Sequence, residues 1–571
     1  MVTVIGRFSF ILHTHLPYVI NHGMWPHGMD WLNECAAESY VPLLNTLNRL
    51  KNEGFHPHLT IGLTPVLTEQ MRDPIFIDTF LGYLQNKIDA ALHDRDIFTQ
   101  WNRPHLVDLT HMWENHYKYI QTSFIETYKK DLVGAFKDLQ DQGLIEIITS
   151  AATHGYLPLI KTDANIQAQI ATGVRVYQRH FGRDPIGIWL PECGYRPGYK
   201  WKAPVGKDHK AYPRKGVEEF LSANGIKYFM VDTHLLMGGE AVGVYAARFK
   251  ALQMLWETFK KQYKPEPVKI DKSPYNVYLV GGNPAIEPVA LFTRDPKTSV
   301  QLWSAEHGYP GDGWYLEFHK KNFPGGLRYW RITSRKSSLG DKWEYEPDKV
   351  GARLDENAGH YKEVIKGVLQ DHFKKTGQPG IIVAPYDTEL FGHWFFEGNE
   401  FLYRVLKWIE MDPELELTTC GAYLEKFPPT TVVKIPEGSW GEGEGHWIWL
   451  NEWTVWTWEK VYECEEIMID LANKYSDTTD QQLQSILRQT AREALLLQSS
   501  DWQFLISTWS ARDYAEDRCA EHYNRFKHLA TMATKYANRE KVDEGDWTYL
   551  GQLEREDRLF KDIDLSDWRT K

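Results

Sequence analysis

The chain has 571 residues, which is long for one ordinary domain, and its 42% apolar residues can fill a sizeable core. Its 65 basic and 77 acidic residues give a net charge of −12, without a long block of lysine and arginine. Because such a surface repels polyanions, the charge argues against a nucleic-acid or anionic-membrane partner and favours a neutral substrate. The five scattered cysteines form no C-x-x-C pair, which argues against a disulfide framework or a zinc knuckle.

The N-terminal segment lacks the pattern of a signal peptide, because no basic stretch precedes a long apolar run and a small-residue cleavage site. No stretch reaches transmembrane length without charges. We therefore expect a cytoplasmic protein without a membrane partner. The sequence leaves the oligomeric state open.

Aromatic residues make up 14% of the chain, with 23 tryptophans. Aromatic faces can cover the C–H faces of sugar rings without a counter-charge, which is one explanation of this content. The other explanation is that large aromatic side chains fill a large core. Their positions have to decide between the two.

Short apolar, β-rich segments recur along the chain at 8–13, 58–63, 144–149, 186–190, 228–231 and 380–384. Helical patterns lie between several of them. One amphipathic helix is predicted from apolar residues spaced three or four positions apart: Ile120, Phe124, Tyr128, Leu132, Phe136 and Leu139. Apolar strands that alternate with helices predict an α/β fold with a mostly parallel sheet, and at this length a barrel.

Strand patterns nearly disappear past about residue 455, where helices are predicted at 483–497 and 514–536. We expect a catalytic barrel over 1–429, with helical insertions at about 70–140 and 246–290. An α-helical C-terminal domain over 430–571 is expected to pack on the barrel and to contribute tryptophans to the site.

Polar side chains come directly after the predicted strands, and a parallel barrel builds its site from the carboxyl ends of its strands. We therefore expect these groups to converge. They are His13, His15, Thr64, His154, Glu192, Asp232, His234, Asp387 and Glu389.

Two of these residues are acids that suit glycosidic chemistry. Glu192 lies in IWLPECGYRP and Asp387 in APYDTELFGHWFFEG, each just past a strand. Cleavage of a glycosidic bond needs one carboxyl group to attack the anomeric carbon and another to protonate the leaving oxygen. Burial against aromatic rings would keep the acid protonated. For Glu192 the plain alternative is a solvated loop acid; for Glu389 we prefer a supporting hydrogen-bond role.

The pair His13 and His15 has two interpretations. With Asp232 and His234 it could hold a metal, as in barrel amidohydrolases. Alternatively, the histidines hydrogen-bond to substrate hydroxyls or to the nucleophile. Because H-x-H lacks a decisive third ligand, we predict no metal here and no cofactor.

The segment 440–458, WGEGEGHWIWLNEWTVWTW, holds six tryptophans. The alternation of Trp447 and Trp449 is compatible with a buried strand. Glycines beside the tryptophans favour instead a loop that presents indoles to sugars. For the later cluster Ser499–Asp501 with Trp502, a capping role and an inter-domain role fit equally well.

Together these segments resemble glycoside hydrolase family 57, most closely its α-1,4-glucan branching enzymes. The resemblance rests on HTHLPYV at 13–19, Glu146 with THG around His154, WLPECGY at 189–195, YDTELFGHWFFEG at 386–398 and WGEGEGHW at 440–447. RDP at 294–296, LWSAEHGYPGDGWYLEFH at 302–319 and SSDWQF at 499–504 favour the branching enzymes.

The resemblance implies a distorted (β/α)7 barrel and a retaining mechanism without a metal, with Glu192 as nucleophile and Asp387 as general acid/base. The expected reaction is transfer of an α-1,4-glucan segment to a 6-hydroxyl; the alternatives are an α-amylase or 4-α-glucanotransferase on the same site and, more remotely, a metal-dependent amidohydrolase. The expected partner is an α-glucan. The implied substrate-binding residues are His13, His15, Trp25, His154, Tyr245, Trp303, His393, Trp440, Trp447, Trp449 and Asp501.

One segment departs from the family pattern. Between Tyr245 and Arg294 the chain carries a long stretch with apolar residues at helical spacing from Phe249 to Tyr263, where the family pattern runs more directly. This departure bears on the loop expected over the site, and so on the balance of transfer against hydrolysis.

Overall fold

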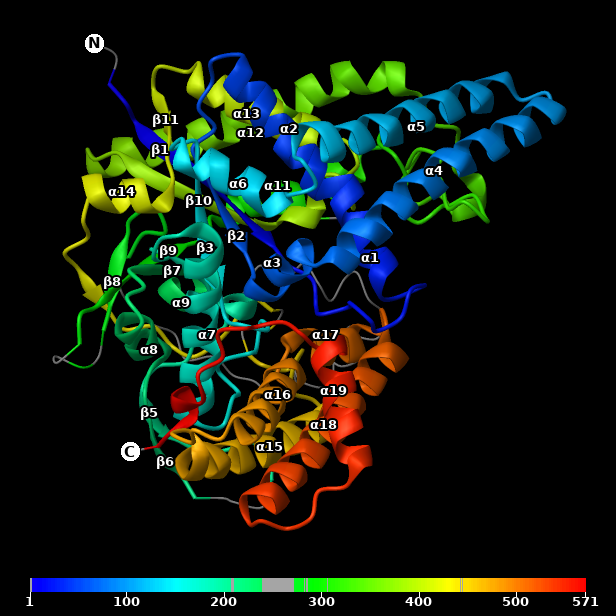
Figure 1. Cartoon of the computed structure of the whole chain (residues 1–571). Coiled ribbons are helices and arrows are strands. Elements are labelled where there is room, and N and C mark those ends of the chain that lie inside the picture. Colours follow the sequence, from blue (N-terminus) through cyan, green and yellow to red (C-terminus); the bar gives the residue numbers. More distant parts are fainter. Residues whose placement is uncertain are drawn as a thin grey trace.

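The computed structural model describes residues 3–206, 210–238, 272–281, 283, 286–304, 307–441, 443 and 445–570. Within these residues, parallel strands form two main sheets (Figure 1), which isolated bridges join into a ring. The ring strands are β1 (Gly6–Thr14), β2 (Leu59–Leu63), β3 (Ile145–Ser150), β4 (Ile188–Trp189), β7 (Tyr228–Val231), β9 (Val289–Thr293) and β10 (Gly380–Asp387).

Two single bridges close this ring. Ladders join β10 to β1, β1 to β2, β2 to β3, β3 to β4, and β7 to β9, all parallel. The bridge Gly187↔Tyr228 joins the β4 end to β7, and Arg294↔Val383 joins the β9 end to β10. The distorted seven-stranded barrel that the resemblance implied is confirmed, and its weakest seams are these two one-residue bridges.

Helices cover the outside of the ring, and short strands lie at its margins (Figure 1). The helices are α1 (Met29–Cys35), α2 (Val41–Asn52), α3 (Pro65–Arg72), α6 (Leu132–Asp141), α7 (Asp163–Phe181), α8 (Val217–Ala223), α9 (Thr233–Met237), α11 (Pro296–Trp303), α12 (Pro347–Thr376), α13 (Gly398–Glu410) and α14 (Cys420–Lys426). The marginal strands are β5 (Tyr199–Trp201), β6 (Tyr212–Arg214), β8 (Tyr278–Val280), β11 (Leu415–Leu417) and β12 (Val432–Val433).

All six predicted strands are present, but β9 was not predicted. Its sequence VALFT is a short, fully buried run without alternation, and it begins inside the segment expected to be a helical insertion. The described part of 246–290 contains β8 rather than a helix. The helical pattern from Phe249 to Tyr263 lies outside the described residues.

The predicted single helix over 120–139 is wrong: the chain forms α5 (Pro104–Thr122), a wider turn at 123–127, and then α6. Lys129 and Lys130 have φ of 52° and 63°, a left-handed conformation that ends a helix. Asp131 then caps α6 by accepting a hydrogen bond from the Gly134 amide at 2.8 Å. The six apolar side chains are nevertheless all buried, so the predicted face is correct.

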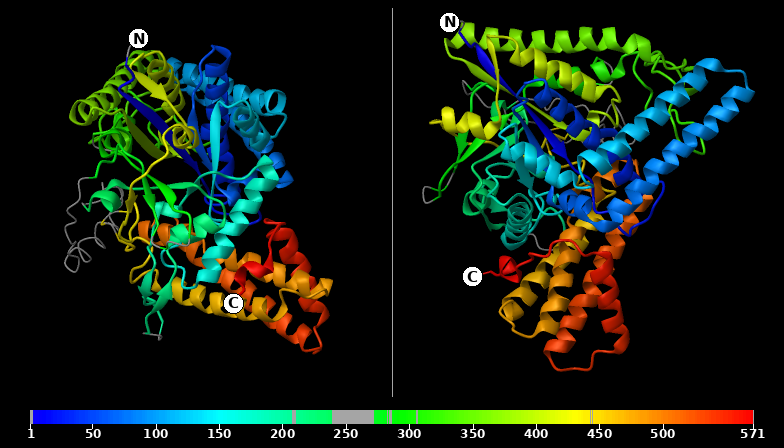
Figure 2. Two further views of the ribbon diagram at one scale, coloured as in Figure 1. Left: turned by 90° about the vertical axis from the view of Figure 1, so that its left-hand side faces the viewer. Right: turned by 45° about the horizontal axis from the view of Figure 1, so that its top comes forward.

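The insertion near 70–140 contains a long helical hairpin formed by α4 (Pro74–Gln100) and α5. Figure 2 shows this blue hairpin projecting from the barrel, with the orange and red C-terminal helices at the other end of the molecule. Those helices are α15 (Val455–Tyr475), α16 (Gln481–Leu497), α17 (Ser500–Thr508), α18 (Arg512–Ala537) and α19 (Glu544–Glu556). The two predicted C-terminal helices are thus confirmed, as α16 and α18.

The C-terminal helices are tied to the barrel by buried polar contacts. His22, on the loop after β1, bonds to Asp557 (Nε2 to Oδ1, 2.7 Å), and Asp557 also pairs with Arg525 of α18. Closer to the strand ends, the Ser500 amide donates to the His154 carbonyl at 3.1 Å. The helical region therefore forms part of the wall above the carboxyl ends of the strands.

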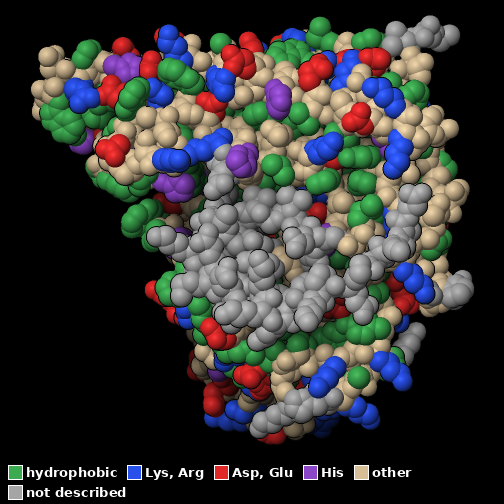
Figure 3. Space-filling model, turned by 180° about the vertical axis from the view of Figure 1, so that it is seen from behind, with side chains coloured by type: hydrophobic (Ala, Val, Ile, Leu, Met, Phe, Trp, Pro, Cys, Tyr) green, Lys and Arg blue, Asp and Glu red, His purple; other side chains and the backbone are tan. Residues whose placement is uncertain are grey.

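Charges of both signs are mixed on one face of the molecule. On the face seen in Figure 3, lysine and arginine side chains are interspersed with aspartate and glutamate, and the described residues form no broad area of one sign. Among the described helices, none is long and apolar enough to cross a membrane.

The Asp557 contacts generate a stability prediction. Asp557→Asn removes the charge that compensates Arg525 in a fully buried position, so the protein should lose about 3 kcal/mol of unfolding free energy. A urea titration measures this loss. The matched control is Asp477→Asn, because Asp477 pairs with Arg569 while 78% exposed, and its removal should leave the midpoint unchanged. Equal midpoints for the two variants would show that the buried pair does not anchor the C-terminal helices.

Candidate active site at the carboxyl ends of the barrel strands

Glu192 stands in a strained turn directly after β4. Its backbone has φ 57° and ψ 27°, inside the short 3-10 turn Pro191–Cys193. Such left-handed geometry is costly for a side chain other than glycine and persists only where surrounding contacts enforce it. Trp440 supplies two of these contacts: its indole Nε1 donates to Glu192 Oε2 at 2.8 Å, and its amide donates to the Glu192 carbonyl at 3.1 Å. One carboxylate oxygen is thereby fixed, and Oε1 remains for other contacts.

Asp387 reaches the same place from the other side of the ring. It is the last residue of β10 and pairs in register with His13 of β1. Burial, with the negative charge of Asp387 adding to it, raises the pKa of Glu192 to about 8. Without substrate, Glu192 is therefore mostly protonated at neutral pH. Retaining glycoside chemistry needs one carboxylate and one acid, so in the roles expected from sequence this proton has to lie on Asp387 when Glu192 attacks.

A chain of histidines lies beside these acids. His13 Nε2 is 3.0 Å from His154 Nε2, and His154 Nδ1 is 4.0 Å from Glu192 Oε1. His15 bonds through Nε2 to Asp501 Oδ2 at 3.0 Å and through Nδ1 to Thr64 Oγ1 at 3.0 Å. Barrel strands and α17 thus meet at one imidazole cluster.

The electrostatics of this cluster favour neutral inner histidines. Burial, followed by the charge of His15, lowers the pKa of both His13 and His154 well below the ordinary value. Although burial alone would raise it, the charge and hydrogen bond of His15 hold the pKa of Asp501 below its ordinary value. Neutral imidazoles present one donor and one acceptor each, which suits sugar hydroxyls.

Three ligand atoms, from His15, His154 and Asp501, lie within 4.8 Å of one another and could in principle hold a metal. Each already has a protein partner: His154 Nδ1 lies 2.9 Å from the Ser500 hydroxyl, and Asp501 accepts from Ser499. Asp232 and His234 do not complete the set, since Asp232 pairs with Arg294 and His234 lies 3.8 Å from Asp232. These contacts favour a hydrogen-bond role, and the absence of a metal stays a prediction.

Glu389 and His393 follow Asp387 but serve different places. Glu389 accepts hydrogen bonds from the Tyr40 hydroxyl at 2.5 Å and from the His15 amide at 3.3 Å, and burial raises its pKa to about 7. This is the supporting position preferred from sequence. His393 instead bonds through Nδ1 to Glu38 Oε2 at 2.7 Å, in a buried cluster with Arg328.

Of the tryptophans named from sequence, Trp440 and Trp303 line the site, whereas Trp447 and Trp449 are buried in turns and Trp25 is exposed on a loop. Trp440 packs edge-on against Trp189 and Trp303, with ring centroids 5.1 and 6.1 Å apart. Trp449 is buried and stacks on Tyr156 at 4.3 Å, and Trp447 is buried as well. Neither forms a strand; both lie in turns, where their burial leaves no open ring face for a sugar. Trp25 is 71% exposed on the loop after β1, and Tyr245 lies outside the described residues.

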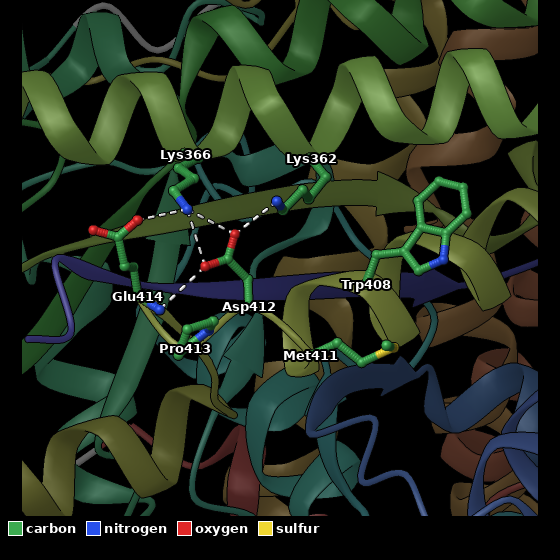
Figure 4. A pocket seen from close by; sticks show the side chains of 7 residues that line it. All are labelled: Lys362, Lys366, Trp408, Met411, Asp412, Pro413 and Glu414. Atoms are coloured by element: carbon green, nitrogen blue, oxygen red, sulfur yellow. Dashed lines mark hydrogen bonds and ion pairs between the residues drawn. The ribbon is translucent and has the colours of Figure 1, made fainter. Parts of the chain in front are cut away.

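A hollow of about 460 Å³ lies away from these groups, between α12, α13 and β11 (Figure 4). Its charged side chains neutralise each other, since Lys362 and Lys366 both reach Asp412 and Lys366 also reaches Glu414. Trp408 and Met411 form its other side. With every charge paired, nothing in this hollow offers an acid, base or nucleophile.

Comparison with known proteins agrees with this geometry. A model described as glycosyl hydrolase family 57 matches residues 9–436, and one described as 1,4-alpha-glucan branching enzyme, C-terminal, matches 460–568. The chain belongs to glycosyl hydrolase family 57. A relative named 1,4-alpha-glucan branching enzyme, from Thermococcus kodakarensis, is 40% identical over 98% of this chain and 78% of its own length.

Two solved structures are similar to this chain over nearly its whole length. A crystal structure of the branching enzyme from Thermococcus kodakaraensis gives a TM-score of 0.89 at 38% identity, covering 100% of this chain and 97% of its own. The structure of the alpha-amylase AmyC from Thermotoga maritima gives 0.80 at 27% identity, covering 99% of both chains. The similarity therefore includes the C-terminal helices as well as the barrel.

Sequence reasoning missed side chains that reach the site from elsewhere in the chain. Tyr40 holds Glu389, Ser500 lies beside His154, and Trp189 stacks on His13 with centroids 4.3 Å apart. Trp189 had a signal, because it ends the strand that leads into the turn carrying Glu192. Tyr40 had none, since it lies on a wide helical turn (Ala36–Tyr40) far from the strand ends in sequence.

The Trp440 hydrogen bond makes a pH prediction. It stabilises the ionised form of Glu192, so Trp440→Phe should raise the pKa of Glu192 further and leave less carboxylate at a given pH. The acidic limb of kcat/KM against pH should move to higher pH by about one unit. Trp189→Phe is the matched control, because that buried indole packs on Trp440 but donates no hydrogen bond to Glu192. The same shift in both variants would contradict the assigned role of the Trp440 N–H.

Proposed function

We propose that this chain is a retaining 1,4-α-glucan branching enzyme, with Glu192 as nucleophile and Asp387 as general acid/base. The observation that carries the chemistry is the position of Glu192 and Asp387 at the carboxyl ends of β4 and β10, near enough for the charge of Asp387 to raise the pKa of Glu192. Support for branching comes from the relative named as a branching enzyme and from the match of residues 460–568 to the C-terminal region of such enzymes.

In the first step an α-1,4-glucan lies across the strand ends. Glu192 Oε1, the oxygen not bonded to Trp440, attacks the anomeric carbon and forms a bond to it. The bond from that carbon to the glycosidic oxygen breaks, and Asp387 gives its proton to the leaving oxygen. His13, His15 and His154 offer hydrogen bonds to the hydroxyls of the donor sugar.

In the second step the 6-hydroxyl of another glucan chain takes the place of the leaving group. Asp387 accepts the hydroxyl proton, the oxygen bonds to the anomeric carbon, and Glu192 leaves as carboxylate. The buried walls formed by Trp440 and Trp303 limit the access of water, which competes with the sugar hydroxyl. An α-1,6 branch results when the sugar wins this competition.

A second candidate is hydrolysis by the same two carboxyl groups. The similarity to the alpha-amylase AmyC over 99% of both chains favours it, because hydrolysis and branching share the first step and differ only in the acceptor. A 4-α-glucanotransferase would differ by using a 4-hydroxyl instead. The reaction products decide among the three.

The test is incubation with amylose, followed by proton NMR for α-1,6 linkages and an assay for new reducing ends. We expect α-1,6 linkages to exceed reducing ends, and the Glu192→Gln variant to form neither while keeping its fold and its affinity for amylose. Reducing ends alone would make the protein an amylase, and shuffled chain lengths without branches a 4-α-glucanotransferase. Near-normal turnover by Glu192→Gln would refute the nucleophile assignment.

A further inference from the structure

A tryptophan-lined hollow lies at the tip of the projecting α4–α5 hairpin, away from the candidate active site. Its volume is about 590 Å³, within the range of small-ligand sites. It is lined by Arg103, His105, Trp330, Lys342, Trp343, Glu344 and Glu346. Arg103 and His105 stand where α5 begins, at the end of the hairpin that projects in Figure 2. The lining shares no residue with the carboxyl and histidine cluster.

The two indoles of this hollow are held in place by their backbone. Trp330 pairs with Glu344 in an antiparallel bridge, and the Arg331 amide donates to the Trp343 carbonyl at 2.9 Å. The Trp343 amide in turn donates to the Thr333 hydroxyl at 2.8 Å. Rigid aromatic side chains lose little conformational entropy on binding, which favours them as contact surfaces.

Cationic side chains pack against the indole rings. The Arg331 guanidinium lies 4.8 Å from the Trp343 ring centroid and 4.2 Å from that of Trp314, and Lys320 Nζ lies 4.4 Å from that of Trp330. Trp343 is still 64% exposed although Arg331 covers one of its faces. Its other face is therefore open to solvent, in contrast to the buried rings of Trp447 and Trp449.

The charges around the indoles cancel. Arg103 pairs with Glu344, Arg331 with Glu346 at 3.6 Å, and Lys342 with the buried Glu317 at 2.9 Å. His105 donates through Nε2 to the Tyr345 carbonyl at 2.8 Å, which leaves Nδ1 for other hydrogen bonds. A rim that is electrically neutral and rich in donors and acceptors does not select a phosphate, a nucleic acid or an acidic peptide. It fits an uncharged ligand with many hydroxyl groups.

We propose that this hollow is a second glucan-binding site, in which the open face of Trp343, with Trp330 beside it, stacks on sugar rings while Arg103, His105 and Glu344 bond to hydroxyls. The choice of an α-glucan rests on the proposed function, since that is the polymer on which the enzyme acts. The site holds a long chain at the hairpin while another part of the same molecule, or another molecule, reacts at the strand ends.

Affinity electrophoresis tests the proposal on the full-length chain in native gels that contain amylose. All variants carry Glu192→Gln, so retention measures binding without turnover. Trp343→Ala should weaken the apparent Kd for amylose about tenfold, the loss expected for one stacking contact. Because Trp343 is largely exposed, this variant should keep its thermal midpoint, which a melting curve checks.

Trp509→Ala is the matched control. Trp509 is also an exposed indole with an arginine beside it, since it is 56% exposed and its ring centroid lies 5.2 Å from the Arg512 guanidinium. It should retain full affinity. Unchanged retention of Trp343→Ala, or equal losses in both variants, would overturn the proposal. So would a dimer, seen by sedimentation, that Trp343→Ala dissociates without affecting retention, because the hollow would then bind a second copy of the chain.

This test separates the second site from the proposed reaction. If amylose yields no α-1,6 linkages but retention still depends on Trp343, branching is wrong and the glucan site stands. If branches form and retention is independent of Trp343, the second glucan site is wrong and the branching reaction stands.

Discussion

The desolvation of Glu192, with the negative charge of Asp387 adding to it, is the constraint on which the rest of the site depends. Moving the pKa of Glu192 from 4.5 to about 8 corresponds to roughly 5 kcal/mol against its ionisation. This net cost already includes the hydrogen bond from the Trp440 N–H, which favours the ionised form, and a hydrogen bond to a charged group is worth about 1.5–3 kcal/mol. At neutral pH this cost keeps a proton on Glu192 in the absence of substrate, and the proposed first step requires that proton to pass to Asp387.

Holding this pair together requires segments from the whole chain. The ring brings β4 and β10 around to the same opening, and it closes through the bridges at Gly187 and Arg294. The turn after Asp387 depends on Gly392, where φ is +112° and an added Cβ would lie 1.9 Å from the Glu38 carbonyl oxygen. The C-terminal helices bring Ser500 and Asp501 to the histidines. The helical region is thus part of the site rather than an appendage.

The strand-end rule predicted most of this arrangement because it depends on topology alone. His13 and Asp387 lie at the carboxyl ends of β1 and β10, and His15, His154 and Glu192 follow β1, β3 and β4. Contacts join His13, His154 and Glu192, and the charge of Asp387 acts on Glu192. Periodicity could not reveal where the chain turns, and two lysines in left-handed geometry divide the helix expected over 120–139. Nor could it reveal that the helical turn Ala36–Tyr40 brings the Tyr40 hydroxyl to Glu389.

Composition likewise could not say which tryptophans face solvent. Trp447 and Trp449 lie among glycines, yet tertiary packing buries both, whereas Trp343 attracts no attention in the sequence and is 64% exposed. A similar limit applies to His393, which the motif places near Asp387 and the fold directs to Glu38. Packing between distant segments decides whether a side chain faces the site or the core. The spacing of residues along one segment cannot predict this.

The central claim is that Glu192 forms a covalent bond to the anomeric carbon while Asp387 donates and then accepts the proton. The most direct measurement uses Asp387→Asn with an α-maltosyl fluoride, whose leaving group needs no proton, followed by rapid denaturation, proteolysis and mass spectrometry. The account predicts a maltosyl adduct on the peptide that contains Glu192, because the first step proceeds and the second lacks its base. An adduct on a different acid, or a hydrolysed product of inverted configuration with no adduct, would contradict it.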